Sequence, residues 1–217
     1  MIQKVGGFLM KIITYSFLQD TEVFLLQLDN KQVFHIPYSV FEKYSLSKNL
    51  ELSNEMYNIL YEYEKYFQAK SAALSYLSYG LKSSKELKEY LAKKYSTSIQ
   101  EKVAEQFIKT GLIDDLYYAK AFTRDKLKLN HYGPRRIQME LKKKGIDEAF
   151  IDETLKEVSK EILIETAYEA SIKKINSLKN KSNFQKKQKI YQFLSYKGFD
   201  YDTIMSVWSK LQEHADV

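Results

Sequence analysis

The stretches LKKKGIDEAFIDETL (residues 141–155) and LSYKGFDYDTIMSVW (residues 194–208) follow one pattern at identical spacing. In both, a glycine lies four residues after the leading leucine, and an apolar residue and an aspartate follow it. Two more apolar residues come four and eight positions after the aspartate. A pattern written twice in this way indicates one supersecondary unit that the chain reuses. The sequence therefore predicts an array of small repeats rather than a single catalytic pocket.

The turn residues of this pattern have the chemistry of a helix–turn–helix connection. Gly145 and Gly198 stand where one helix must end, because glycine adopts a positive φ without steric cost. Asp147 and Asp200 are suited to cap the next helix by accepting hydrogen bonds from its free N–H groups. The apolar residues one before and four after each aspartate have hydrophobic-staple spacing, which fixes the angle between the helices. Each unit is therefore predicted to be a helix, a tight turn and a helix.

An earlier copy of the unit is more divergent. Leu87 and Leu91 have the same spacing as an apolar pair in each of the other copies, Ile137 with Leu141 and Ile190 with Leu194. The glycine turn is replaced by a longer turn over residues 95–98. Ser98 and Glu101 have capping-box spacing, which predicts that a helix starts after Ser98. A further helix lies upstream of every copy, with alanines at matching positions: Ala69, Ala119 and Ala167. We predict three modules of three helices, over residues 66–113, 114–158 and 159–217.

The first fifty residues differ from the repeats. Apolar and aromatic runs over 8–18, 23–28 and 32–36 predict a three-stranded β-meander within residues 1–50. A meander of this size is too small to be stable alone, so it is expected to pack on helices. Ser53 is the predicted N-cap of a connecting helix over 51–65 that continues into the first module. The predicted fold class is mainly α, with tandem three-helix repeats and a small N-terminal meander.

Bulk composition excludes several classes of protein. The 217 residues contain no cysteine, which leaves neither a disulfide framework nor thiolate chemistry. No apolar run approaches the ~18 residues that a membrane span needs, so no membrane association is expected. The start of the chain lacks the cleavage site of a signal peptide, and a cytoplasmic monomer is expected. The formal net charge of +6 permits an acidic partner without identifying one.

No catalytic motif stands out. The three histidines (His35, His131 and His214) are far apart and have no acid or serine at motif spacing. The sequence contains neither a phosphate-binding glycine loop nor a zinc-binding cluster, so no cofactor or metal is expected. The pair Asp114 and Asp115 precedes an apolar-periodic run, which favours an N-cap followed by a favourable first-turn charge. The protein is therefore predicted not to be an enzyme.

Positive charge concentrates on the middle helix of the second module. We orient this helix with Ile137 and Leu141 facing the core. Because successive residues of a helix are rotated by about 100°, several basic residues then lie on the outward side and form a cationic stripe. The stripe consists of Arg135 and Lys142, with Arg136 and Lys143 on one flank. Such a stripe is typical of an ordinary solvated face. Two features favour binding: the equivalent helices lack the full set, and arginine suits bidentate contact with carboxylate or phosphate.

Two neighbouring features have two interpretations each. Tyr132 and His131 either stack on a nucleobase or cover the loop, and Pro134 fits the first turn of the helix that follows. The lysine-rich residues 179–189 form either a solvated loop or a non-specific phosphate contact. Neither feature identifies a ligand by itself.

The central segment, from the end of the first module through the second, also carries a recognisable set of residues. They are Gly111, Leu112, Ile113, Asp114, Asp115, Ala119, Phe122, Arg124, Gly133, Pro134, Ile137, Leu141, Lys144, Gly145 and Ile146. In this combination the sequence resembles the RecX family of recombination regulators, over about residues 65–212. The N-terminal strands are similar to an extension found in longer, Gram-positive-type members. The first module departs from the family pattern at 95–98, where the glycine turn is absent.

The resemblance implies a non-enzymatic repeat protein of DNA repair and the SOS response. It implies binding in the helical groove of the RecA nucleoprotein filament and modulation that is usually inhibition. A repeat array offers a long surface that suits such a groove. The expected partners are the RecA filament and single-stranded or duplex DNA, which the protein alone would bind weakly. The expected contact residues are Arg124, Lys128, Tyr132, Arg135, Arg136, Lys142, Lys143 and Lys144.

Three other interpretations remain open at this point. A stand-alone nucleic-acid-binding repeat protein would bind bare DNA tightly and with a steep dependence on salt. A structural adaptor would make no DNA contact, and a cryptic enzyme would need a site that the motifs do not show. Binding of the protein alone to single-stranded DNA at physiological salt separates these interpretations.

Overall fold

The computed structural model describes residues 10–213. The interpretation of the chain's start, the first two residues of the first predicted strand, and His214 lie outside the described residues. The chain divides into two compact units. Of the described residues, one unit joins 10–79 with Tyr90–Gln106, and the other joins Gly80–Glu89 with 107–213. Within residues 10–213, no helix combines the length and the apolarity needed to cross a membrane.

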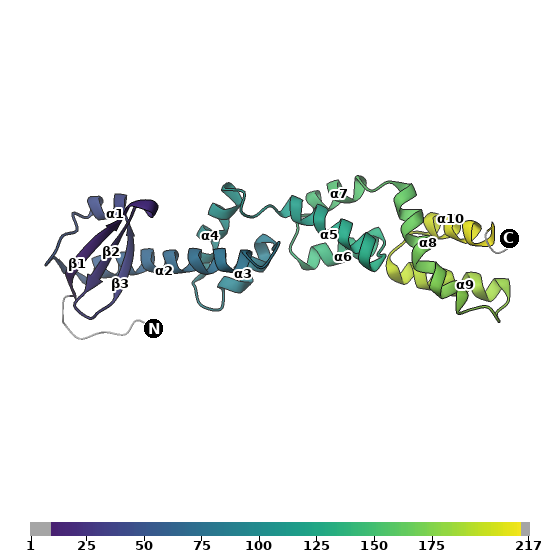
Figure 1. The fold of residues 1–217 in the computed structure, drawn as a ribbon, viewed down its shortest axis with the longest axis horizontal. Coiled ribbons are helices and arrows are strands. Elements are labelled where there is room, and N and C mark those ends of the chain that lie inside the picture. Colours follow the sequence, from purple (N-terminus) through teal and green to yellow (C-terminus); the bar gives the residue numbers. More distant parts are fainter. Residues whose placement is uncertain (1–9, 214–217) are drawn as a thin grey trace. The chain divides into compact units, whose positions relative to one another are not determined.

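The first unit contains an antiparallel sheet of four strands in the order β3-β2-β1-β4 (Figure 1). β1 (Met10–Leu18), β2 (Val23–Leu28) and β3 (Val33–Pro37) form the predicted meander, which is confirmed. β4 (Glu51–Leu52) pairs with the start of β1, so these two residues belong to the sheet and not to the connecting helix predicted over 51–65. A strand of two residues has too little periodicity to be visible in a sequence.

A long helix packs on this sheet. α1 (Tyr38–Lys43) follows β3, and α2 (Asn54–Leu77) begins after Ser53, whose hydroxyl caps it as predicted. α2 runs without a break through the predicted connecting helix into the first module. Glu64 of α2 is buried; it accepts a 2.6 Å hydrogen bond from the backbone N–H of His35, and the ring Nδ1 lies 2.9 Å away. These contacts attach β3 to α2 and satisfy a carboxylate that is costly to bury alone.

The other helices confirm the modular order and the mainly helical fold class. The first module is completed by α3 (Ser84–Leu91) and α4 (Thr97–Lys109). The second contains α5 (Asp115–Asn130), α6 (Pro134–Lys143) and α7 (Glu148–Lys156). The third contains α8 (Lys160–Asn176), α9 (Asn183–Lys197) and α10 (Tyr201–Glu213).

The turn glycines, the capping aspartates and the buried apolar residues of the repeats occupy the predicted positions. Gly145 and Gly198 adopt φ values of 76° and 96° at the predicted turns. Asp147 and Asp200 each accept a 2.8 Å hydrogen bond from a backbone N–H of the helix they precede. The apolar pairs of the middle helices are almost fully buried in all three modules: Leu87 and Leu91, Ile137 and Leu141, Ile190 and Leu194.

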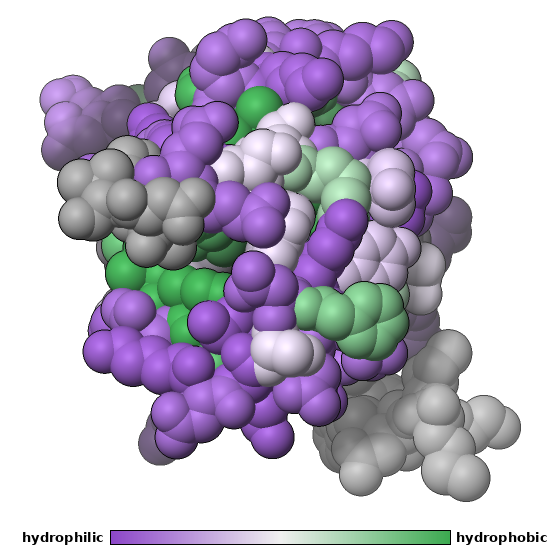
Figure 2. Space-filling model, turned by 90° about the vertical axis from the view of Figure 1, so that its right-hand side faces the viewer, coloured by the Kyte–Doolittle hydropathy of each residue, from purple (hydrophilic) through white to green (hydrophobic). Residues whose placement is uncertain are grey.

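Each module of the second unit has its own apolar core. In the second module, Ala119 of α5 packs with the apolar pair of α6 and with Ile151 of α7. In the third module, Ala167 of α8 packs with the pair of α9 and with Trp208 of α10. The end of the chain that carries α9 and α10 presents mainly hydrophilic side chains, with small separate apolar patches (Figure 2).

Two local predictions need correction. α4 begins at Thr97, so Ser98 and Glu101 lie inside the helix rather than forming a capping box at its start. The carbonyl of the residue before Thr97 already accepts an N–H of the first turn. The lysine-rich segment is not a loop throughout, because Ser182 and Gln185 form a capping box that starts α9. Its last lysines therefore lie on a helix.

Candidate functional site

The predicted contact residues lie on α5, on α6 and in the turns beside α6. Pro134 occupies the first turn of α6 as predicted, and Ile137 and Leu141 face the core. This orientation leaves Arg135 exposed. Arg136 differs, because only 27% of its side chain is accessible. Arg136 lies on the flank of the stripe as predicted, but its side chain is largely covered rather than displayed outward.

Arg136 lies between two tyrosine rings. Its guanidinium carbon is 4.0 Å from the centroid of the Tyr132 ring and 5.1 Å from that of Tyr196, within the range of cation–π attraction. Its Nε lies 3.6 Å from the Glu140 carboxylate, which also pairs with the Lys126 ammonium at 3.5 Å. Tyr132 therefore covers the loop and holds Arg136, which favours the structural one of its two interpretations.

α6 meets the end of α9 through backbone hydrogen bonds. The N–H groups of Gly133 and Arg135 donate to the carbonyls of Lys197 and Gly198, at 2.8 and 3.1 Å. The free N–H groups at a helix start and the free carbonyls at a helix end satisfy each other in this way. A Cβ on Gly133 would stand 2.4 Å from the Gly198 carbonyl carbon. We call this contact, formed by Gly133, Arg135, Lys197 and Gly198, the α6–α9 joint.

The other end of α6 packs on the start of α3. The Ser83 hydroxyl donates to the Lys144 carbonyl at 2.8 Å, and the Lys85 ammonium donates to the Lys143 carbonyl at 3.1 Å. The Lys144 ammonium pairs with the Glu86 carboxylate. Lys144 is therefore engaged within the chain rather than displayed as an unpaired cation.

The first-turn carboxylates of α5 have separate roles. Asp114 caps α5 by accepting a 2.8 Å hydrogen bond from the backbone N–H of Tyr117, as predicted. Asp115 accepts hydrogen bonds from the backbone N–H and the hydroxyl of Ser84, at the start of α3. The second carboxylate thus does more than interact with the helix dipole, because it also links two helices.

Five of the eight predicted contact residues are exposed cations: Arg124, Lys128, Arg135, Lys142 and Lys143. Lys142 pairs with Glu148 at 2.6 Å, and Arg124 has a distant neighbour in Asp125 at 3.8 Å. The side chains of Lys128, Arg135 and Lys143 form no hydrogen bond or ion pair with any described residue. These cations are available to an acidic or phosphate-bearing partner.

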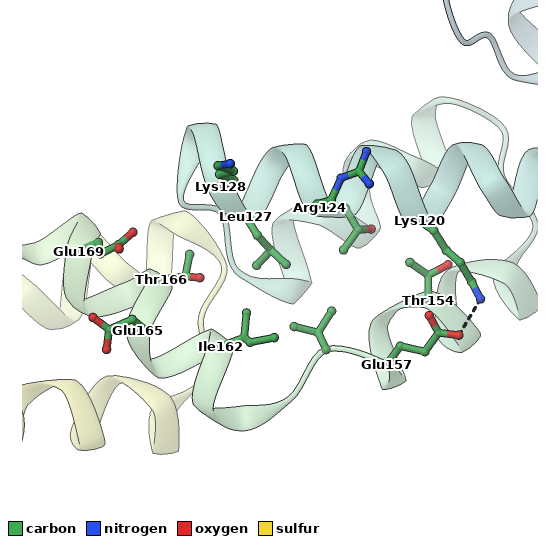
Figure 3. A pocket seen from close by; sticks show the side chains of 12 residues that line it. Lys120, Arg124, Leu127, Lys128, Thr154, Glu157, Ile162, Glu165, Thr166 and Glu169 are labelled. Carbon is green, nitrogen blue, oxygen red and sulfur yellow. Dashed lines mark hydrogen bonds and ion pairs between the residues drawn. The ribbon is translucent and has the colours of Figure 1, made fainter.

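A cleft of about 510 Å³ lies between α5, α7 and α8 (Figure 3). Leu127 of α5 and Ile162 of α8 point toward each other across it. At one end, the Lys120 ammonium forms a 2.6 Å ion pair with Glu157, the residue that follows α7. The buried hydroxyls of Thr123 and Thr154, which also line the cleft, have no hydrogen-bond partner within the described chain.

A second cleft, of about 440 Å³, lies between α8 and α9 and is more basic. Its basic residues are His131, Lys173, Lys174 and Lys197. Burial, together with the nearby charge of Arg136, lowers the pKa of Lys197 below its ordinary value. Glu169 also lines this cleft, 3.2 Å from Nε2 of His131. The concentration of positive charge suits a phosphate group.

Gly133→Ala is expected to destabilise the protein, although the φ of Gly133 is −82° and needs no glycine. The added methyl group would collide with the backbone at the end of α9, and overpacking of this kind costs about 1–3 kcal/mol. Urea unfolding followed by circular dichroism measures the loss. Met139→Ala on α6 is the control and should be nearly neutral, because Met139 is exposed. Equal stability of both variants would contradict the close approach at the α6–α9 joint.

Sequence reasoning missed the residues that act between modules. Tyr196, Lys197 and Glu86 each contact a predicted residue of the second module. Their sequence signal is only a position beside a turn or a helix start, which does not identify a partner. Within residues 10–213, no group of three or more histidine, aspartate or glutamate side chains is placed to hold a metal ion.

Three family models match the chain in order. They describe the first, second and third three-helix domains of RecX and match residues 69–107, 114–155 and 161–208. The matched segments follow the three helical modules seen in the structure. The first module matches its family model although residues 95–98 replace the glycine turn.

Related proteins and structures agree with these matches. The chain is 34% identical over 202 residues to the regulatory protein RecX of Finegoldia magna, covering 88% of this chain and 95% of that protein. It is 33% identical over 186 residues to the regulatory protein RecX of Clostridioides difficile, covering 86% and 88%. A crystal structure of regulatory protein RecX matches with a TM-score of 0.77 and 26% identity, over 92% of this chain and 98% of that one. That of RecX from Lactobacillus salivarius matches with a TM-score of 0.65 and 30% identity, over 68% and 97%. The chain therefore belongs to the RecX family of regulatory proteins.

Proposed function

We propose that this protein regulates homologous recombination by binding the RecA nucleoprotein filament in its helical groove and inhibiting its activity. Membership of a family of regulatory proteins supports the general role. The observation that carries the proposal is the set of exposed cations on α5 and α6, since the side chains of three of them form no hydrogen bond or ion pair within the described chain. Exposed positive charge steers a protein toward an acidic assembly and orients it there.

The proposed contact residues separate into two roles. The five exposed cations, Arg124, Lys128, Arg135, Lys142 and Lys143, would contact the filament directly. Tyr132, Arg136 and Lys144 would act by positioning α6, because each is held against another module of the chain. Inhibition by occupying the groove requires no catalytic group, so this mechanism needs only shape and charge.

The direct test compares RecA-dependent ATP hydrolysis and strand exchange with and without the purified protein. Both activities are expected to fall as the protein is added. The effect should diminish as salt rises, because charges separated by more than about 8–10 Å are screened at physiological ionic strength. Unchanged activities at saturating protein would refute the proposal, whereas a rise in strand exchange would preserve filament binding but reverse the sign of regulation.

Stand-alone DNA binding is the second candidate, and the basic cleft between α8 and α9 favours it. A protein that acts this way would bind bare single-stranded DNA at physiological salt, with an affinity that falls steeply as salt increases. The filament mechanism instead predicts weak binding to bare DNA and much tighter binding to RecA-coated DNA. Measuring both affinities side by side distinguishes the two candidates.

A further inference from the structure

We infer that the cleft between α5, α7 and α8 is the docking site for a protein segment of the RecA filament. The segment would carry an apolar anchor side chain beside an acidic residue. This inference rests on the proposed function and deepens it, because it assigns the cleft to the protein of the filament rather than to its DNA. Three features of the cleft carry it: its apolar walls, its unpartnered hydroxyls and its distribution of charge.

The walls of the cleft are apolar and partly open. Leu127, Val158 and Ile162 line it, and Leu127 and Ile162 face each other across the gap (Figure 3). Ile162, in the first turn of α8, is 50% exposed. An apolar anchor from a partner would remove this surface from water, and anchors of this kind dominate the energetics of protein interfaces. A DNA backbone offers no equivalent apolar group.

Two buried hydroxyls give the cleft an unsatisfied polar lining. Thr123 of α5 and Thr154 of α7 are each 3% exposed, and neither hydroxyl has a hydrogen-bond partner within the described chain. Buried polar groups are almost always hydrogen-bonded, so an exception asks for an explanation. Each hydroxyl oxygen exposes less than 1 Å², so a polar group of an inserted segment, such as a backbone N–H or carbonyl, would supply the missing partner only where neighbouring side chains move aside on binding.

The charges around the cleft favour protein over nucleic acid. α5 contributes three cations to its lining, while the carboxylates are those of Glu157, the residue after α7, and of Glu165 and Glu169 on α8. Each of these glutamates is paired within the chain, with Lys120, Lys210 and His131 respectively. Lys128 has no such partner, and Arg124 has only the distant Asp125. The unpaired charge is therefore positive and confined to the α5 wall.

This arrangement suits one acidic side chain better than a run of phosphates. An acidic residue beside the anchor would meet Arg124 and Lys128 on the α5 wall. A strand of DNA in the cleft would carry a charge on every nucleotide, and it would bring phosphates against the carboxylates of the opposite wall. Like charges brought together in this way oppose binding.

The test uses the full-length chain and a biotinylated single-stranded oligonucleotide on a biosensor, either bare or coated with RecA and a non-hydrolysable ATP analogue. Ile162→Ser is expected to lower the affinity for the coated oligonucleotide about tenfold, as for the loss of an interface anchor. Thr123→Val is expected to lower it as well, with no fall in the unfolding midpoint, because the change removes an unpartnered hydroxyl. Affinity for the bare oligonucleotide should not change. Leu129→Ser is the matched control, since Leu129 is 71% exposed on the same helix as Thr123 and does not line the cleft.

Each outcome has a defined meaning. Wild-type affinity of Ile162→Ser for the coated oligonucleotide would overturn the inference, and so would an equal loss on the bare oligonucleotide. If Ile162→Ser does not fold, Thr123→Val decides by the same two criteria. Failure of the wild-type protein to bind the coated oligonucleotide would instead refute the proposed function.

Discussion

Gly198→Ala is expected to lower the free energy of unfolding by about 2–5 kcal/mol. Gly198 has a φ of 96°, and a residue with a Cβ in a left-handed conformation costs about 1–2 kcal/mol. The new Cβ would also stand 2.5 Å from the backbone nitrogen of Arg136, and overpacking against such a group costs about 1–3 kcal/mol. Backbone atoms held in the α6–α9 joint cannot move aside as a flexible side chain can. Urea unfolding followed by far-ultraviolet circular dichroism measures the loss.

Two further glycines separate the cost of the left-handed backbone conformation from the cost of the steric clash. Gly111 has a φ of 71°, but a Cβ there would meet nothing within 4 Å. Gly111→Ala therefore measures the cost of the left-handed conformation alone. At Gly145 the three nearest atoms to the Cβ all belong to the Lys85 side chain; its outer atoms can rotate, but its own Cβ, at 2.6 Å, moves only with the backbone of α3. The expected order of destabilisation is Gly198→Ala, then Gly145→Ala, then Gly111→Ala. A loss for Gly198→Ala no larger than that for Gly111→Ala would show that the α6–α9 joint does not resist the added methyl group.

The local architecture could be predicted from sequence because its determinants are close together along the chain. A turn glycine, the aspartate two residues later and the apolar residue four beyond it form one helix–turn–helix signal. The same is true of the Ser53 cap of α2 and of Pro134 in the first turn of α6. The start of α4 was predicted less well. Its turn lacks glycine, so several serine and threonine residues compete as the cap.

The surroundings of Arg136 could not be predicted in the same way. Helical periodicity places it correctly on the flank of α6, but it does not reveal that the end of α9 covers that flank. The partners, Tyr196 and Gly198, lie about sixty residues away along the sequence. The unpartnered hydroxyls of Thr123 and Thr154 are hidden for the same reason, since burial and hydrogen bonding depend on the packing of three helices. Contacts between modules are therefore where sequence patterns stop being informative.

Arg135→Glu combined with Lys143→Glu is expected to weaken binding to the RecA filament by at least about tenfold, because two attractive charges become repulsive. The pair is chosen because both side chains are exposed and neither forms a hydrogen bond or ion pair within the described chain. The fold should therefore survive, which circular dichroism can verify. Arg136 is left unchanged, because its reversal would place a carboxylate between two tyrosine rings and beside Glu140. A loss of binding after that change would report on folding as much as on contact.

Lys173→Glu combined with Lys174→Glu provides the matched control for this double reversal. It changes the net charge by the same amount, but on α8, where both lysines line the basic cleft. If α6 makes the principal filament contact, the control should reduce inhibition of strand exchange less than the α6 variant does. If instead the α6 variant inhibits as well as wild type and the α8 variant does not, the contact face belongs to the third module. Because both variants alter long-range attraction equally, only a difference between them identifies the surface that touches the filament.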